Sequence, residues 1–374
     1  MKIKADRAAL LKALAHVQSV VEKRNTIPIL ANVKIEAKDV RLTLTATDME
    51  IAVVEEVPAT SMTDGACTAP AATLYEIVRK LPECAEIQLD HAGGDAQLGL
   101  RAGRYATTLV VLPTDDFPSM TAGTLSYRFA LSAHDLRNLI DRTRFAISTE
   151  ETRYYLNGIY LHAADSDGVP VLRAVATDGH RLARFQVALP EGAGKIPGVI
   201  VPRKTVVELR KLLDETTAEV DVALSETRIQ FKAGPVTLTS KLIDGTFPEY
   251  ERVIPRDNDK VLRVGKKDFS DAVGRVAAIS AERSRPVKLA IERNLLTLSA
   301  SSPDQGAAKE ELDGERVKYD STPLEIGFQA RYLTDITDQI DREIEFRFSD
   351  GAAPTVVQDA ADPSALYVLM PMRV

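Results

Sequence analysis

The stretch of this sequence with the most enzyme-like chemistry is Thr177-Asp178-Gly179-His180-Arg181. It places a carboxylate, an imidazole and a cation close together, as a metal-dependent hydrolase or nuclease would need. The simpler interpretation is a tight Asp-Gly turn that ends one strand and begins the next. A single His beside a single Asp lacks the other members of a catalytic site. We therefore expect a turn here, with no catalytic residue.

Motifs for other common chemistries are missing from the sequence. It has no phosphate-binding loop ending in Gly-Lys-Ser/Thr, no His-Glu-x-x-His, no Gly-x-Ser-x-Gly and no dinucleotide-binding fingerprint. The five His are scattered singly, and Cys67 and Cys84 are the only cysteines. Two cysteines support neither a disulfide framework nor a four-ligand zinc site. We expect no metal and no cofactor.

One order of elements occurs three times along the chain. Thr47-Asp48 ends an alternating stretch, and Thr177-Asp178 ends a similar one 130 positions later. Phe117-Pro118 and Phe247-Pro248 are separated by the same offset. Internal repeats of this length indicate repeated domains. We expect three similar domains, with boundaries at residues 1–121, 128–251 and 260–374.

Each expected domain contains two helices and several strands. Apolar residues at helical spacing predict the helices, and Pro70 and Pro202 lie near the start of two of them. Alternating residues predict strands, for example over 29–35, 220–224 and 228–231. Clustered strands with two interspersed helices indicate an α+β fold with antiparallel sheets. The predicted helices span residues 6–23, 73–81, 133–145, 203–213, 266–279 and 331–340.

The charge of the chain argues against a uniformly basic surface. Its 374 residues include 47 Lys and Arg against 54 Asp and Glu, a net charge of -7. The six predicted helices nevertheless sum to +6, and the first helix of each domain is +1. Such helices would suit sequence-independent contact with nucleic-acid phosphates. Helix propensity alone also favours Lys and Arg, so this pattern leaves both interpretations open.

The sequence also bears on where the protein works. No uncharged apolar run approaches the roughly 20 residues that span a bilayer. Charged residues begin at Lys2, too early for a secretory leader. We expect a cytoplasmic protein that does not enter a membrane.

Several longer motifs follow one another to the last residue of the chain. They are Pro28-Ile29-Leu30, Arg153-Tyr154-Tyr155-Leu156-Asn157-Gly158, Ala176-Thr177-Asp178-Gly179-His180-Arg181-Leu182, Val201-Pro202-Arg203-Lys204, Ser240-Lys241-Leu242-Ile243-Asp244-Gly245-Thr246-Phe247-Pro248-Glu249-Tyr250 and Tyr367-Val368-Leu369-Met370-Pro371-Met372-Arg373-Val374. In this order they resemble, end to end, the bacterial DNA polymerase III beta subunit, the replicative sliding clamp.

The resemblance implies a fold and a function. It implies three sliding-clamp domains per chain, each with two helices against antiparallel sheets, and a head-to-tail homodimer that forms a six-domain ring. Such a ring encircles duplex DNA without sequence specificity and confers processivity without a catalytic site of its own. The implied partners are the clamp-loader complex, the replicative polymerase alpha subunit and other DNA polymerases. Repair and ligation proteins would also bind, all through short linear peptide motifs.

The resemblance further implies two sets of functional residues. The partner-peptide pocket would comprise Arg153, Tyr155, Leu156, Thr177, Gly179, His180, Arg181, Leu182, Pro248, Arg252, Val253, Tyr332, Val368, Leu369, Met370, Pro371, Met372, Arg373 and Val374. For DNA, it emphasises Arg24, Tyr154 and Tyr155 in loops at the ring face. The charge pattern of the helices adds Arg7, Lys12, Arg137, Arg142, Arg203 and Lys204.

The sequence departs from the family pattern at a few positions. Glu150 stands where relatives often have Gln, and Ser284 where the best-known relatives have Phe. At the expected dimer seam, Ala106, Thr107 and Ala278 replace Arg, Phe and Ile. These residues put the corresponding DNA, pocket and seam contacts in question.

Two other functions are compatible with parts of the sequence. One is a metal-dependent hydrolase that uses Asp178 and His180. The other is an interaction scaffold that never encircles DNA. The first predicts that His180→Ala abolishes hydrolysis of a phosphate ester, and the second predicts a monomer that is not retained on DNA.

Overall fold

The computed structural model describes residues 1–22, 26–94, 96–121, 123–216, 218–279 and 286–373. Its contacts divide the chain into two compact units. One comprises Met1–Arg137, Pro190–Pro197 and Lys204–Leu242, and the other comprises Asn138–Leu189, Gly198–Arg203 and Ile243–Val374.

The first unit is built on a 12-stranded antiparallel sheet. Its main path runs β8-β7-β6-β1-β4-β16-β15-β14-β9, and β2, β3 and β5 branch from β4 through β3. The strands are β1 (Lys2–Asp6), β2 (Asn32–Lys38), β3 (Arg41–Thr47), β4 (Ile51–Thr63), β5 (Gly65–Pro70), β6 (Glu86–Asp90), β7 (Gln97–Ala102), β8 (Tyr105–Val110), β9 (Tyr127–Ser132), β14 (Glu219–Leu224), β15 (Arg228–Ala233) and β16 (Val236–Lys241).

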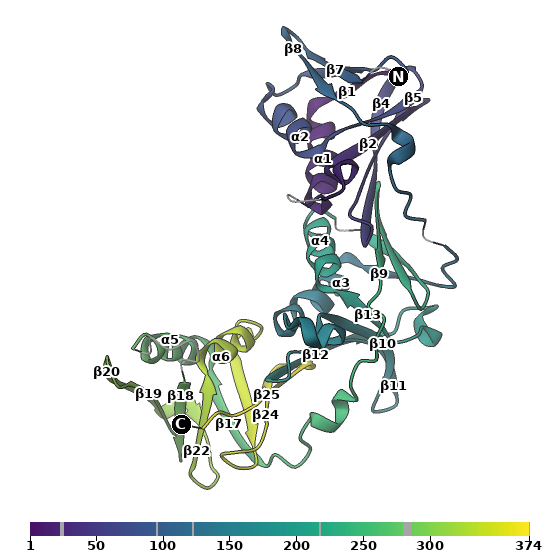
Figure 1. Cartoon of the computed structure of the whole chain (residues 1–374). Coiled ribbons are helices and arrows are strands. Elements are labelled where there is room, and N and C mark those ends of the chain that lie inside the picture. The colour runs from purple at the N-terminus through teal and green to yellow at the C-terminus, as the bar shows by residue number, and fades with distance from the viewer. Residues whose placement is uncertain (23–25, 95, 122, 217, 280–285, 374) are drawn as a thin grey trace. The chain divides into compact units, whose positions relative to one another are not determined.

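Helices α1 (Arg7–Val20) and α2 (Ala71–Lys80) lie side by side in this unit (Figure 1). The carboxylate of Asp6 caps α1 by accepting the backbone N–H groups of Ala8 and Ala9 at 2.9 and 3.0 Å. Leu10, Leu14 and Val17 of the apolar stripe that predicted α1 are fully buried. Leu11 is only half-buried, and Val21 lies just beyond the helix. Burial of this stripe against the strands fixes the helix on the sheet.

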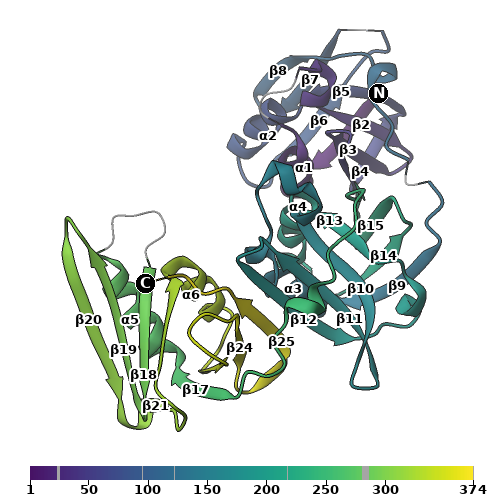
Figure 2. The same ribbon diagram turned by 60° about the horizontal axis from the view of Figure 1, so that its bottom comes forward.

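The second unit contains a 9-stranded sheet and a 4-stranded sheet, both antiparallel. Their orders are β13-β10-β11-β12-β25-β24-β23-β17-β21 and β20-β19-β18-β22, and Figure 2 shows the smaller sheet. The strands are β10 (Gly158–Ser166), β11 (Val169–Thr177), β12 (Arg181–Ala188), β13 (Val199–Pro202), β17 (Lys260–Gly265), β18 (Pro286–Glu292), β19 (Leu295–Ser302), β20 (Gly306–Asp313), β21 (Val317–Lys318), β22 (Leu324–Gln329), β23 (Glu343–Phe348), β24 (Thr355–Asp359) and β25 (Asp362–Leu369).

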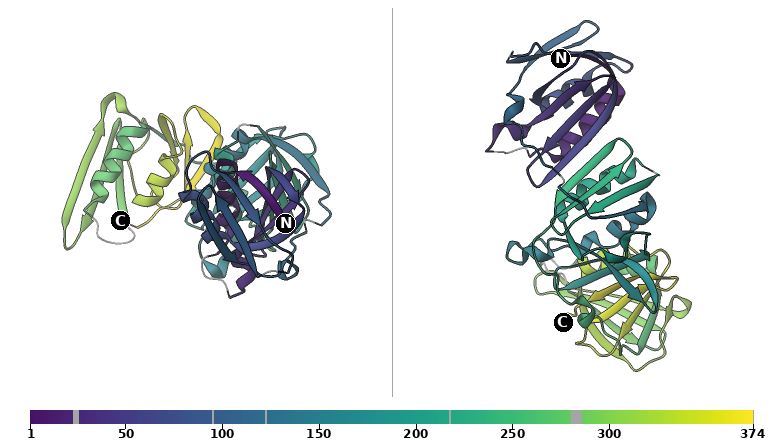
Figure 3. Two further views of the ribbon diagram at one scale, coloured as in Figure 1. Left: turned by 90° about the horizontal axis from the view of Figure 1, so that it is seen from above. Right: turned by 90° about the vertical axis from the view of Figure 1, so that its right-hand side faces the viewer.

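Helices α5 (Lys266–Ala277) and α6 (Ala330–Thr337) pack against each other and lie beside the strands of this unit (Figure 3). The remaining helices are α3 (Ala133–Asp141) and α4 (Arg203–Asp214), whose residues are divided between the two units. Short 3-10 helices are η1 (Pro28–Ala31), η2 (Thr114–Asp116), η3 (Arg144–Ala146), η4 (Glu151–Leu156), η5 (Ala193–Lys195), η6 (Tyr250–Val253) and η7 (Gly314–Arg316). The α+β class with antiparallel sheets is confirmed.

Both large sheets run across the expected domain boundaries. In the first unit β4 pairs with β16, with Val53 opposite Leu238. In the second unit β12 pairs with β25, with Leu182 opposite Val368. Strands of successive repeats therefore satisfy each other's backbone groups at these two junctions, so these edges are not exposed.

Several predicted elements have different bounds in the structure. The strand expected over 29–35 is wrong in its first half, because η1 occupies Pro28–Ala31 and β2 begins only at Asn32. The helix expected over 133–145 ends at Asp141, and Arg142 and Arg144 lie beyond it. With these bounds α3 contains Arg137 against Asp135 and Asp141, so its predicted positive charge is wrong.

Candidate functional site

A cavity in the second unit is lined by an apolar floor and a charged rim, and we call it the motif pocket. Its volume is about 360 Å³. The 3-10 helices η4 and η6, the turn between β11 and β12, and the end of β25 supply its walls. The lining residues are Arg153, Tyr155, Leu156, Thr177, Gly179, Arg181, Leu182, Pro248, Glu249, Tyr250, Val253, Val368 and Met370.

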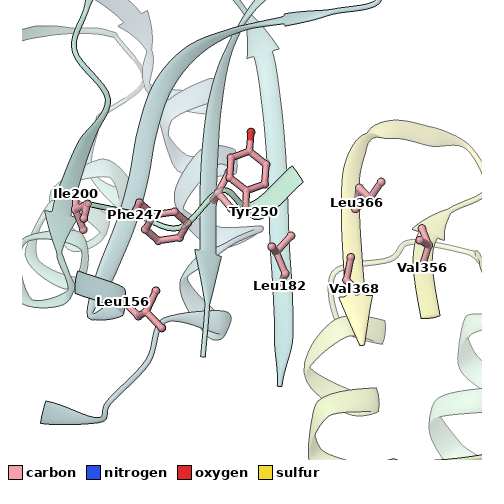
Figure 4. Packing of buried hydrophobic residues seen from close by; sticks show 9 residues of the cluster. Leu156, Leu182, Ile200, Phe247, Tyr250, Val356, Leu366 and Val368 are labelled. Carbon is pink, nitrogen blue, oxygen red and sulfur yellow. The ribbon is translucent and has the colours of Figure 1, made fainter. Parts of the chain in front are cut away.

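The floor of the motif pocket belongs to a buried apolar cluster. Leu156, Leu182, Tyr250 and Val368 are buried in that cluster, and Figure 4 shows them coming from four separate segments of the chain. Strand pairing places Leu182 directly opposite Val368. Apolar walls around a cavity of this size suit small apolar side chains of a ligand.

The Thr177–Arg181 stretch forms the tight turn that the sequence predicts. One oxygen of Asp178 accepts the backbone N–H groups of His180 and Arg181 at 2.9 and 3.0 Å. The Thr177 hydroxyl donates to the carbonyl of Arg181 at 2.7 Å and accepts the N–H of Gly179. Both oxygens of Asp178 are engaged, because the second lies 3.2 Å from Nε of Arg181.

The hydrolase hypothesis fails on this geometry. Asp178 holds the turn and the Arg181 guanidinium, while His180 stacks on Tyr332 with ring centroids 6.0 Å apart. Among the residues that the structure describes, no group of three His, Cys, Asp or Glu could hold a metal ion. The site offers a surface for recognition.

The first repeat contains the same turn. The Thr47 hydroxyl donates to the carbonyl of Ile51 at 2.8 Å, as Thr177 does to Arg181. Asp48 accepts the N–H groups of Glu50 and Ile51 at 2.9 and 2.7 Å. The 130-residue offset in the sequence is therefore repeated in the hydrogen bonds of the turn.

Arg153 lies at the rim of the motif pocket in a bidentate ion pair with Glu150. Nη2 of Arg153 is 2.7 Å from Oε1 of Glu150, and Nε donates to Oε2 at 2.8 Å. The remaining nitrogen, Nη1, approaches Gly179 so closely that a Cβ there would lie 2.5 Å from it. The side-chain hydrogen bond from Arg153 lowers the pKa of Glu150, so the carboxylate is ionised at neutral pH.

Arg181 occupies the opposite, buried side of the rim. It is ion-paired with Asp178 at 3.2 Å and with Asp335 at 2.5 Å, and it donates to the carbonyl of Phe145 at 2.7 Å. Its guanidinium lies 4.5 Å from the ring centroid of Tyr332. The guanidinium is thus part of the wall of the motif pocket, already neutralised by two carboxylates.

The structure places most, but not all, of the expected pocket residues along the cavity. Arg252 instead borders a neighbouring cavity of about 880 Å³ and is ion-paired with Glu249 at 2.5 Å. Leu369 is fully buried in β25, and Met372 is joined to Gly327 by a backbone bridge. Val374 is outside the described residues, and His180, Tyr332, Pro371 and Arg373 do not line the cavity.

Two lining residues, Glu249 and Tyr250, were not expected there. Both stand at the end of the Ser240–Tyr250 motif, so the motif itself was the signal that could have identified them. Tyr250 packs edge-on against Phe247, and its hydroxyl contacts His162 at 3.0 Å. Tyr250 therefore forms a common wall between the motif pocket and the neighbouring cavity.

Four of the cations suggested for DNA contact have partners within the protein. Nε of Arg7 donates to the carbonyl of Val78 at 3.1 Å and Nη2 to that of Arg79 at 2.6 Å. Lys12 is ion-paired with Glu215 at 2.9 Å. Arg137 donates to the carbonyl of Leu213, and Lys204 binds both Asp48 and Glu22.

The other suggested DNA residues are placed differently. Arg203 is exposed and forms no ion pair with any described residue, and Arg142 is half-buried. Tyr154 is exposed on η4, so its expected loop is a 3-10 helix, and its ring meets that of Tyr155 edge-on at 5.8 Å. Tyr155 lines the motif pocket. Arg24 lies outside the described residues.

The departures from the family pattern have different surroundings. Glu150 is occupied by its pair with Arg153. Ala106 is exposed and Thr107 half-buried on β8, and Ala278 is exposed just after α5. Ser284 lies outside the described residues.

Comparison with known proteins covers the whole chain. Models of the N-terminal, central and C-terminal domains of the DNA polymerase III beta subunit match residues 1–121, 130–249 and 251–373. The beta sliding clamp of Caulobacter vibrioides is 54% identical, and that of Escherichia coli 37%, each with 100% of both chains covered. A crystal structure of the Caulobacter crescentus beta sliding clamp has a TM-score of 0.97 at 54% identity, covering 100% of this chain and 99% of that one. The sliding clamp of Bartonella birtlesii bound to griselimycin has a TM-score of 0.96 at 49% identity, with 100% of both chains covered.

Proposed function

Because this chain belongs to the family of bacterial DNA polymerase III beta subunits, it is a sliding clamp, and we propose that it holds its partners through the motif pocket. It is a processivity factor without a catalytic site of its own. Two copies form the head-to-tail homodimer of the family, which encircles duplex DNA and tethers the polymerase and other partners through peptide motifs.

The observation that supports the motif pocket is its lining. Leu156, Leu182, Val253, Val368 and Met370 present apolar surface, and the charges at the rim are paired inside the protein. Met370 is 41% exposed at the edge of the cavity, where its flexible thioether can adapt to different side chains. A short peptide with apolar side chains gains affinity from such a surface, and several partners can use it in turn.

For DNA, we propose that Arg203 and Tyr154 contribute directly. Arg203 is exposed without an ion pair to any described residue, so its charge is available to a phosphate. Tyr154 is 53% exposed, and its ring can stack on a base or a sugar. Arg7, Lys12, Arg137 and Lys204 contribute mainly by holding the protein together.

We also propose the finer domain boundaries and the location. Domains at 1–121, 128–251 and 260–374 follow from the repeated turn and the repeated Phe-Pro pair. The cytoplasm is the proposed location, because replication takes place there in bacteria. Within the described residues, no helix combines the length and the apolarity needed to cross a membrane.

Retention on DNA tests the clamp function. With clamp loader and ATP present, the protein should remain on nicked circular DNA through a salt wash and leave the same DNA after it is linearised. Free ends let a ring slide off, whereas electrostatic binding would be lost equally from both forms. Equal loss from circular and linear DNA would exclude the ring.

Truncation tests the motif pocket. Removing residues 370–374 takes away Met370 and the backbone bridge from Met372 to Gly327. Binding of peptides derived from the polymerase alpha subunit should be abolished, while sedimentation still shows a dimer. Unchanged peptide affinity in the truncated dimer would refute the pocket assignment.

A further inference from the structure

Each charged side chain that lines the motif pocket has a partner of opposite charge inside the protein. Arg181 is paired with Asp178 and Asp335, and Glu249 with Arg252. The third such residue, Arg153, is paired with Glu150. The described residues that line the pocket therefore present no uncompensated charge to an incoming peptide.

The pair between Arg153 and Glu150 is intermediate in exposure. Arg252 and Glu249 are 80% and 71% exposed, so their pair is largely screened by solvent. The Arg181 side chain is 5% exposed and is held by two ion pairs, a hydrogen bond and two aromatic rings, so it is fixed by the core. Arg153 is 32% exposed, and two of its nitrogens are held by Glu150 alone. Its third nitrogen faces Gly179, where the turn leaves room only because no Cβ is present. Glu150 is thus the group that decides where this guanidinium lies.

We propose that Glu150 is a positioning and specificity-determining residue of the motif pocket, which holds Arg153 at the rim and denies its charge to acidic side chains of incoming peptides. This inference rests on the proposed function of the pocket. With Glu150 present, an acidic residue near the rim is attracted by the guanidinium and repelled by the carboxylate. Acidic motifs then gain no advantage over neutral ones.

Removing the Glu150 charge gives acidic side chains an advantage at the rim. In Glu150→Gln the guanidinium loses its counter-charge and its bidentate contact, so it becomes available for an acidic peptide side chain. A basic peptide side chain at the same place gains a repulsion that the native pair cancels. If Glu150 had a purely structural role, Glu150→Gln would weaken the binding of acidic, neutral and basic peptides alike.

Glu151 provides a matched control. It is the next residue, is exposed, and forms no ion pair with any described residue. Glu151→Gln changes the net charge of the chain by the same amount as Glu150→Gln. Any effect of overall charge on peptide binding appears in both variants, whereas an effect through Arg153 appears only in Glu150→Gln.

The experiment measures peptide affinity by fluorescence anisotropy on the full-length dimer. Overlapping peptides of the polymerase alpha subunit first identify one that binds, and each of its positions is then replaced by Glu and by Lys. At the peptide position that meets the rim, we expect Glu150→Gln to raise the affinity for the Glu peptide about fivefold. The affinity for the Lys peptide should fall by a similar factor. High salt should erase both effects.

The possible outcomes separate this inference from the proposed function. The role of Glu150 would be overturned if the wild-type, Glu150→Gln and Glu151→Gln proteins ranked the affinities of the Glu, neutral and Lys peptides in the same order at every position. An equal shift in both variants would overturn it as well. Peptide binding that survives removal of residues 370–374 would instead overturn the pocket assignment itself.

Discussion

Nη1 of Arg153 occupies the space where a side chain at Gly179 would begin, since a Cβ there would lie 2.5 Å away. The backbone of Gly179 has φ +87°, but the equivalent Met49 of the first repeat has φ +76° and carries a side chain. The turn conformation alone therefore does not require glycine at this place. A side chain at this position would displace the Arg153 guanidinium, and this contact links the repeated turn to the rim of the motif pocket.

Gly179→Ala should weaken peptide binding about tenfold. The methyl group would push Arg153 away from the turn and change the rim, while left-handed backbone at a non-glycine residue costs about 1 kcal/mol. Peptide affinity by fluorescence anisotropy and thermal unfolding of the same sample separate these two effects.

Gly168→Ala is the control for backbone strain. Gly168 lies in the turn between β10 and β11 with φ +84°, and a Cβ there would meet nothing within 4 Å. The Gly168→Ala substitution should lower the stability of the protein as Gly179→Ala does, and it should leave peptide affinity unchanged. Equal affinity in the two variants would show that the contact with Arg153 has no influence on the pocket.

Arg181→Met should destabilise the second unit by about 3 kcal/mol. The side chain is buried, and its removal leaves Asp178 without its ion pair and Asp335 with only Arg331, 3.6 Å away. Urea denaturation followed by circular dichroism measures the loss. Arg153→Met is the comparison, because that half-exposed side chain should affect peptide affinity and leave the unfolding midpoint nearly unchanged. Equal destabilisation by both substitutions would contradict the structural role of Arg181.

Local sequence patterns predicted the turn at Asp178 and the helices correctly in outline. Asp and Gly favour tight turns wherever they occur, and the carboxylate of Asp178 bonds to backbone only two and three residues away. The apolar spacing of α1 likewise reflects a buried stripe within one helix. Such features depend on neighbours in the chain, so the sequence contains them directly.

Long-range pairings could not be obtained in this way. The second partner of Arg181 is Asp335, 154 residues further along the chain. Charge counting on α1 suggested that Arg7 faces phosphate, but its guanidinium binds carbonyls at the end of α2. A cation that satisfies a helix C-terminus looks the same in a sequence as a cation that faces solvent.

Arg203→Ala should weaken DNA binding, whereas Lys204→Ala should have a smaller effect. Arg203 is exposed and forms no ion pair among the described residues, while Lys204 already binds Asp48 and Glu22. Loss of one phosphate contact reduces the slope of log affinity against log salt by about 0.9 per subunit. Titration of a short duplex at several salt concentrations measures this slope. A larger loss of DNA affinity in Lys204→Ala than in Arg203→Ala would mean that Lys204, and not Arg203, contacts phosphate.

The buried His16 should make the stability of the first unit depend on pH. Its Nδ1 lies 2.7 Å from Glu55 and its Nε2 3.2 Å from Glu215, and only the protonated imidazole can donate from both nitrogens. Burial alone would lower the pKa of His16, but hydrogen bonds and charge attraction from Glu55 and Glu215 outweigh it and raise the pKa above its usual value.

A raised pKa in the folded state fixes the sign of this dependence. The stabilisation by His16 is complete below the pKa of the unfolded chain, near 6.5, and is lost as the pH rises through the higher folded value. The melting temperature should therefore fall between about pH 6 and pH 9 more steeply in the wild-type protein than in His16→Asn. His134→Asn, which changes an exposed His on α3, should follow the wild-type slope. Parallel slopes for the wild-type and His16→Asn proteins would mean that this buried imidazole is not charged in the folded state.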